Sequence, residues 1–228
     1  MTLGFPEALL RAEELAAQSE RRVVLGICGS PGAGKTLLAE RLVAGLNRRR
    51  PGSAAHVPMD GFHLADSTLE RLGRRERKGA PDTFDGWGYA ALLERLGEGG
   101  EDPVYAPDFE RDLEEPIAGS IEVPGTARVV VSEGNYLLLP DRPWSRARAA
   151  FSEVWFCVLP DELRMRRLVA RHMRFGRNER DAAQWAEEVD GPNARLIEQF
   201  RHTADLEVST AEVYTPAEVI PETASKVP

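Results

Sequence analysis

The chain has 228 residues, 42% of them hydrophobic and 29% charged, with a formal net charge of -8. This length and balance predict one globular α/β domain over residues 1–228 with a sizeable core. The acidic balance argues against DNA or RNA as a partner, because nucleic-acid binders usually present a basic surface. No apolar run approaches the ~18 residues of a membrane span, and the N-terminus lacks the apolar region of a signal peptide. We therefore expect a cytoplasmic protein.

The first predicted elements are an amphipathic helix over residues 6–20 and a buried apolar strand over 23–28. Apolar residues at helical spacing from Leu37 to Leu46 predict a second helix. Between this strand and helix the chain reads Gly29-Ser30-Pro31-Gly32-Ala33-Gly34-Lys35-Thr36. The segment fits Gly-x-x-x-x-Gly-Lys-Ser/Thr, and its strand and helix flanks are those that a P-loop requires.

A P-loop binds the phosphates of a nucleoside triphosphate. Its glycines let backbone N–H groups converge on phosphate oxygens, and the helix N-terminus adds partial positive charge. Lys35 is predicted to reach the β- and γ-phosphates, and the Thr36 hydroxyl to ligate Mg²⁺. The alternative, a chance glycine turn, leaves both flanking elements unexplained.

A second strand is predicted near residues 56–59, and Asp60 stands at its end, before Gly61. Ligands of open α/β sheets bind beyond the carboxyl ends of the strands. Asp60 could therefore accept the proton of a substrate hydroxyl and align its oxygen for attack on a phosphate. A helix-capping or turn aspartate is the alternative interpretation.

The middle of the chain predicts further elements. Residues 64–87 are predicted as loop with a short helix, 89–96 as a helix, and the proline-containing stretch 103–121 as irregular structure or a hairpin over the site. Val-Val-Val-Ser at 129–132 predicts a third buried strand, and Glu133 follows it. This is the position of a Walker B acid, which could hold Mg²⁺ through water or polarise an acceptor. An exposed loop glutamate is the alternative.

The C-terminal part predicts a fourth strand at 154–159, helices at 161–174, 179–188 and 192–202, a weak strand at 206–208, and a loose tail over 214–228. Buried strands alternating with helices predict a parallel sheet flanked by helices on both faces, the P-loop NTPase fold. Three-and-four spacing aligns four arginines along one face of the 161–174 helix: Arg164, Arg167, Arg171 and Arg174.

The arginines predict a helical lid within residues 161–190. A mobile helix could carry cationic groups to the γ-phosphate and exclude water from the site. A solvated basic face, paired with nearby glutamates, is the alternative.

Among P-loop proteins, the sequence favours a kinase. The Asn-Lys-x-Asp guanine motif of GTPases is absent, because no asparagine precedes any of the three lysines, Lys35, Lys78 and Lys226. The Leu-Ser-Gly-Gly-Gln-like signature of transporter ATPases is also absent.

Three segments add a family resemblance: Met-Asp-Gly-Phe-His-Leu at 59–64, Arg-Lys-Gly-Ala-Pro-Asp-Thr-Phe-Asp at 77–85, and Glu-Gly-Asn-Tyr-Leu-Leu at 133–138. They resemble the uridine kinase, pantothenate kinase and phosphoribulokinase group over roughly residues 20–210. The chain looks closest to a bacterial branch labelled nucleoside/nucleotide kinase or fructose-transport kinase. The resemblance implies a P-loop kinase fold, ATP with Mg²⁺ as the phosphate donor, and a small hydroxyl-bearing acceptor.

The resemblance also implies roles for individual residues. Asp60 matches the catalytic base of the group, and Glu133 matches its Glu-Gly pair after the third strand. Phe84 and Asp85 resemble the segment that borders the acceptor pocket.

Two further regions are implied by the same group. Tyr105 and Phe109 resemble a Pro-x-Tyr region that closes the pocket, although this chain reads Tyr-Ala-Pro-Asp-Phe. Arg167 and Arg171 are the implied phosphate contacts of the lid. His63 could hydrogen-bond an acceptor hydroxyl or be an ordinary loop histidine.

The sequence therefore predicts an ATP-dependent kinase that phosphorylates a hydroxyl of a nucleoside, a sugar or a pantothenate-like metabolite. The expected catalytic residues are Asp60, Lys35, Glu133 and Arg171. A nucleotide-binding regulatory or accessory ATPase without an acceptor is the alternative, and acceptor-dependent ADP release separates the two. A homodimer is compatible with either.

Overall fold

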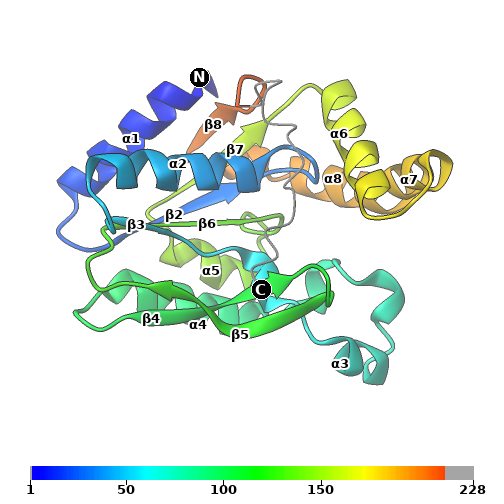
Figure 1. Cartoon of the computed structure of the whole chain (residues 1–228), viewed down its shortest axis with the longest axis horizontal. Helices are drawn as coiled ribbons and strands as arrows, with labels where there is room; N and C mark the ends of the chain where they lie inside the picture. The colour runs from blue at the N-terminus through cyan, green and yellow to red at the C-terminus, as the bar shows by residue number, and fades with distance from the viewer. Residues whose placement is uncertain (1, 214–228) are drawn as a thin grey trace, which may run out of the picture.

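Six parallel strands form the central sheet of the computed structural model, which describes residues 2–213 (Figure 1). The spatial order β1-β8-β7-β2-β6-β3 places β2 between β7 and β6. The strands are β1 Thr2–Leu3, β2 Val23–Cys28, β3 Ala54–His56, β6 Val129–Gly134, β7 Glu153–Val158 and β8 Leu206–Ser209. All residues of β2 and β6 are buried, as expected for strands covered on both faces.

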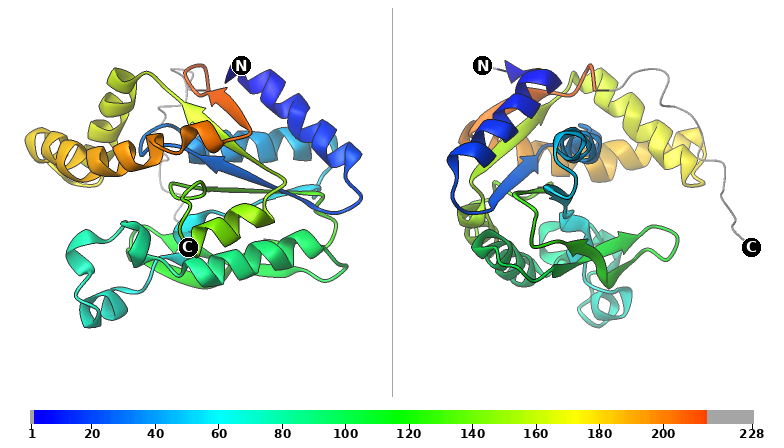
Figure 2. Two further views of the ribbon diagram at one scale, coloured as in Figure 1. Left: turned by 180° about the vertical axis from the view of Figure 1, so that it is seen from behind. Right: turned by 60° about the vertical axis from the view of Figure 1, so that its left-hand side comes forward.

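Helices cover both faces of the sheet, as the sequence predicts. Alternate residues of β2 enter different cores: Leu25 and Ile27 pack with α1 (Phe5–Gln18) and α2 (Lys35–Arg49). On the opposite face Val24 packs with α4 (Gly86–Glu98) and α5 (Trp144–Ala150), which lie side by side in Figure 2. The predicted α/β fold with a parallel sheet between helices is confirmed.

The proline-containing stretch forms an antiparallel hairpin outside the sheet. Its strands are β4 (Val104–Glu110) and β5 (Glu115–Val123), with a register irregularity between Ala106 and Asp108. The hairpin contacts a short 3₁₀ turn, η1 (Met59–Phe62), which contains Asp60. Of the two predicted alternatives, irregular structure or hairpin, the structure forms the hairpin.

The C-terminal helices extend beyond the sheet on the right of Figure 1. They are α6 (Asp161–Arg174), α7 (Glu179–Trp185), a π-helical turn (Ala186–Asp190) and α8 (Gly191–Glu198). The predicted helix over 179–188 therefore ends earlier as an α-helix, and 192–202 divides into α8 and a 3₁₀ turn at Arg201–Thr203.

Three other features differ from the sequence prediction. The second strand lies earlier, because β3 ends at His56, although Val57 N still donates to Val131 O at 2.9 Å. The two-residue β1 and the seven-residue α5 were not predicted, since short elements carry little periodicity.

The short helix that was predicted within 64–87 is present as α3 (Asp66–Arg71). The predicted loose tail at 214–228 lies outside the described residues.

The described residues contain no helix that is both long and apolar enough to cross a membrane.

Candidate active site

The P-loop connects β2 to α2 at the carboxyl edge of the sheet. Gly32 and Gly34 adopt positive φ angles of 80° and 88°, which other residues rarely tolerate. A Cβ on Gly32 would lie 2.7 Å from Leu168 Cγ, so the absence of a side chain also lets α6 pack against the loop. Strand, loop and helix therefore stand as the motif predicts.

The Lys35 side chain lies across the loop. Its Nζ donates to the carbonyl of Gly29 at 2.9 Å and to that of Ser30 at 3.3 Å, and the residue is only 9% exposed. The ammonium group is therefore held at the loop, where the phosphates of a nucleotide are expected.

The Glu133 side chain contacts Thr36 in the first turn of α2. In the sheet it is the register partner of Ile27, so β6 places its carboxylate next to the P-loop. Thr36 Oγ1 donates to Glu133 Oε1 at 3.0 Å. Burial, together with the nearby charge of Asp60, raises the pKa of Glu133 from 4.5 to about 7, against the opposing effect of Lys35.

This pair fits Mg²⁺ as a kinase binds it. Among residues 2–213, no three His, Cys, Asp or Glu side chains are grouped to hold a metal ion without other ligands. Mg²⁺ at nucleotide sites takes one or two protein ligands and completes its shell with water and phosphate oxygens. The hydroxyl of Thr36 and the carboxylate of Glu133 supply that number of oxygen ligands.

Two glycines fix the position of Asp60. A Cβ on Gly61 would lie 2.3 Å from Pro107 O of β4, and one on Gly134 would lie 2.7 Å from Met59 Cβ. The turn that carries Asp60 is therefore in close contact with the hairpin on one side and with β6 on the other. The Asp60 carboxylate is half-buried and lies 4.0 Å from Arg111 Nη2.

A pocket of about 450 Å³ opens between the P-loop side and the hairpin. It is lined by the predicted residues Thr36, Asp60, Phe109 and Glu133. Sequence reasoning missed the other lining residues, among them His56, Asp108 and Arg111. The position of His56 at a strand end was the available signal for that residue, whereas nothing local marks Asp108 and Arg111.

Three ring-bearing residues predicted to bind substrate, His63, Phe84 and Phe109, pack together and are partly inside the core. The His63 ring lies between Phe84 and Phe109, with centroid distances of 4.0 and 4.8 Å, and burial lowers the pKa of His63. Phe84 is 8% exposed and packs edge-on against Tyr136 and Trp144. Of this group, Phe109 lines the pocket, and His63 and Phe84 stand behind it.

Two residues predicted to bind substrate lie elsewhere. Asp85 is the N-cap of α4 and accepts a hydrogen bond from Gly88 N at 2.8 Å. Tyr105 on β4 is 54% exposed and is not among the residues that line the pocket. The family resemblance gave both residues a role in substrate binding, and that role stays a prediction.

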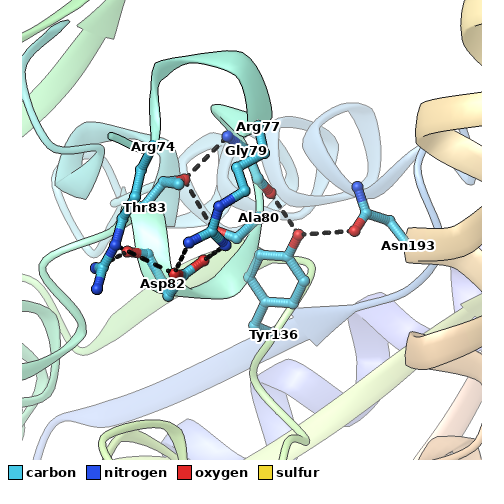
Figure 3. Close-up of polar contacts among 8 residues, drawn as sticks. All are labelled: Arg74, Arg77, Gly79, Ala80, Asp82, Thr83, Tyr136 and Asn193. Atoms are coloured by element: carbon cyan, nitrogen blue, oxygen red, sulfur yellow. Dashed lines mark hydrogen bonds and ion pairs between the residues drawn. The ribbon is translucent and has the colours of Figure 1, made fainter. Parts of the chain in front are cut away.

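The motif at 77–85 forms a loop held by its own hydrogen bonds and ion pairs and by Tyr136 (Figure 3). Arg77 Nη1 pairs with Asp82 Oδ1 at 2.5 Å, and Thr83 Oγ1 donates to Ala80 O at 2.7 Å. The Tyr136 hydroxyl, from the segment after β6, donates to Gly79 O and lies 3.5 Å from Oδ1 of Asn193 on α8. The Tyr136 hydroxyl therefore links this loop to α8.

The four arginines predicted along one face of α6 differ in their burial and contacts. Arg164 is 8% exposed, pairs with Asp161 at 2.6 Å and donates to Pro31 O at 3.2 Å, so it fixes α6 to the P-loop. Arg167 is half-buried and Arg171 is exposed. Neither lines the 450 Å³ pocket, so their contacts with phosphate stay a prediction.

A second cavity of about 700 Å³ borders the other side of the loop. Ser30, Arg164 and Arg195 are among its lining residues, and it shares no lining residue with the first pocket. Ser30 Oγ donates to Glu198 Oε1 at 3.0 Å, which joins the loop to α8.

The parallel sheet, the P-loop and the Thr36–Glu133 contact define the class as a P-loop nucleotide-binding protein. No protein-family model matches the chain. A candidate uridine kinase of Schizosaccharomyces pombe is 30% identical over 210 residues, covering 89% of each chain.

Comparison with solved structures points to the same group of kinases. A candidate fructose transport system kinase from Silicibacter sp. TM1040 superposes with a TM-score of 0.78 at 36% identity, over 88% of this chain and 97% of its own. The YFH7 protein of Saccharomyces cerevisiae also gives a TM-score of 0.78, at 18% identity over 91% and 98%, which shows the fold alone. The chain belongs to the uridine kinase and pantothenate kinase group of P-loop kinases, and it is an ATP-dependent kinase of that small-molecule family.

Proposed function

We propose that this protein transfers the γ-phosphate of ATP to a hydroxyl group of a small metabolite: a nucleoside, a sugar or a pantothenate-like compound. The observation that carries the proposal is a single pocket with two kinds of lining residue. Thr36 and Glu133 line it beside the P-loop, and Asp60 lines it from the 3₁₀ turn after β3. A hydroxyl bound there would share one pocket with the Asp60 carboxylate and with phosphates held at the P-loop.

The chain's residues divide the work of transfer. Asp60 takes the hydroxyl proton or aligns the oxygen for in-line attack. The oxygen's electron pair forms the new P–O bond while the bond between the γ-phosphorus and the bridging oxygen of ADP breaks. Lys35 stabilises the charge on the phosphate oxygens, with Arg167 and Arg171 as the lid contacts.

Thr36 and Glu133 are the proposed ligands of Mg²⁺, which when bound neutralises charge on the transferring phosphoryl group. Glu133 is nearly buried, at 5% exposure. A bound cation favours its ionised form, and the hydrogen bond from Thr36 already orients one of its oxygens.

The test is ADP release from ATP and Mg²⁺ across a panel of acceptors, in the wild type and in Asp60→Asn. Uridine and fructose come first, because the names of two relatives mention them. We expect at least one acceptor to stimulate ADP release, and Asp60→Asn to reduce that stimulated rate on the order of 10²- to 10⁴-fold.

ATP affinity, measured by calorimetric titration, serves as the control and should be nearly unchanged in Asp60→Asn. Slow ADP release that no acceptor stimulates, and that Asp60→Asn leaves unaltered, would contradict the proposal and favour a regulatory ATPase.

A further inference from the structure

We infer that the 450 Å³ pocket selects an uncharged polyhydroxy acceptor, a sugar or nucleoside, and that His56 is a specificity-determining residue that hydrogen-bonds one of its hydroxyls. The inference rests on the proposed kinase function and narrows it to one chemical class of acceptor.

The first observation is the charge of the pocket. Four carboxylates line it besides Glu133, the proposed Mg²⁺ ligand: Glu40, Asp60, Asp108 and Glu110. Arg111 is the one lysine or arginine among its described lining residues, and it already lies 4.0 Å from Asp60. Even with Mg²⁺ beside the phosphates, an acceptor that carries a carboxylate or a phosphate would be repelled.

The same carboxylates suit hydroxyl groups. An ionised carboxylate accepts hydrogen bonds and donates none, and a sugar hydroxyl is a donor that brings no charge. Hydrogen bonds to charged acceptors are stronger than those between neutral groups. The Phe109 ring adds an apolar wall, supported by His63, against which the C–H face of a sugar or a base can lie.

The second observation is independent of charge. His56 lines the pocket from the last position of β3, and its Nε2 is buried with no hydrogen-bond partner among residues 2–213. Buried polar atoms are nearly always paired, so an orphaned one at a pocket wall indicates a partner supplied by the ligand. Burial lowers the pKa of His56 to about 4, so the ring is neutral at pH 7 and Nε2 can pair with a hydroxyl.

The charge inference is tested with matched acceptor pairs in the ADP-release assay. The pairs are uridine and uridine 5′-phosphate, fructose and fructose 6-phosphate, and panthenol and pantothenate. If the enzyme phosphorylates either member of a pair, we expect kcat/KM for the neutral member to be at least on the order of tenfold higher than for the anionic one. A preference for an anionic member would overturn the inference and leave the kinase function standing.

The role of His56 is tested with two variants of similar size. His56→Leu removes the polar atom and should raise the acceptor KM on the order of tenfold with little change in kcat or ATP affinity, which is the loss of about one hydrogen bond. His56→Gln restores a polar group near the Nε2 position and should recover most of that loss.

The exposed His202 provides the matched control as His202→Leu, and thermal unfolding verifies that each variant is folded. An acceptor KM that is unchanged in folded His56→Leu would overturn the role of His56. Failure of every acceptor, neutral or anionic, with ADP release unchanged in Asp60→Asn, would overturn the proposed function itself.

Discussion

The phosphate side and the acceptor side of the site are built in different ways. One continuous segment, residues 23–36, supplies the strand, the P-loop, Lys35 and Thr36. The proposed acceptor pocket instead collects side chains from α2, β3, the turn at Asp60, the β4–β5 hairpin and β6. Phosphates are bound by backbone geometry that local sequence determines, whereas acceptor recognition depends on which distant segments meet. The phosphate side can therefore be shared within a family, while the acceptor side sets the substrate.

Lys35→Ala attacks the phosphate side and should have the largest effect. Because the ammonium group is held at the loop by Gly29 O and Ser30 O, its loss removes charge stabilisation from the ground state and the transition state together. We expect turnover to fall on the order of 10²- to 10³-fold and ATP affinity to fall with it. Calorimetric titration with ATP checks the second effect, and an unchanged affinity would contradict the P-loop assignment of this lysine.

Two glycine substitutions separate the sides directly. Gly61→Ala would place a Cβ 2.3 Å from Pro107 O and so displace Asp60, whereas Gly32→Ala would place one 2.7 Å from Leu168 Cγ and distort the P-loop. We expect Gly61→Ala to reduce acceptor-dependent turnover on the order of 10²-fold with ATP affinity nearly intact.

Gly32→Ala should show the reverse pattern, weaker ATP binding with a smaller effect on the acceptor KM. Steady-state kinetics with ATP and acceptor varied separately measures both variants. If each impaired both substrates equally, the two sides would not be separable as described.

Glu133 lines the pocket beside the P-loop, and in addition to its proposed role at Mg²⁺ its protonation affects stability. Since burial raises its pKa from 4.5 to about 7, the folded state holds this proton more tightly than the unfolded state. Its ionisation should therefore reduce the free energy of unfolding as pH rises from about 4.5 to about 7, by up to about 1.4 kcal/mol per pH unit.

Glu133→Gln should remove that loss, so the ligand-free variant gains stability over the wild type across this range and keeps the gain above it. Denaturant unfolding at pH 5 and pH 8 measures the difference, with Glu122→Gln on the exposed part of β5 as the control. Unfolding energies of wild type and Glu133→Gln that change in parallel with pH would contradict the assigned shift.

Local patterns predicted the sheet, the P-loop and both strand-end carboxylates. Asp60 and Glu133 follow apolar strands, and the carboxyl ends of parallel strands share one edge, so their proximity to the loop could be anticipated. The bounds of β3 were less accurate, because Pro58 and Met59 extend the apolar pattern past the point where pairing ends.

The residues that line the acceptor pocket were harder to predict. Arg111 becomes a neighbour of Asp60 only when the hairpin packs on the turn, and no periodicity in the sequence encodes that contact. Asp85 shows that a motif does not fix the placement of a side chain: its motif resembles one that borders an acceptor pocket, whereas its carboxylate caps α4.

The most direct test of the account is to observe the product. Phosphorus NMR of a reaction containing ATP, Mg²⁺ and the acceptor that most stimulates ADP release distinguishes a phosphate ester from free phosphate. We expect a new phosphomonoester signal that grows in step with ADP and does not appear with Asp60→Asn. Inorganic phosphate as the sole product, with every acceptor in the panel, would contradict it.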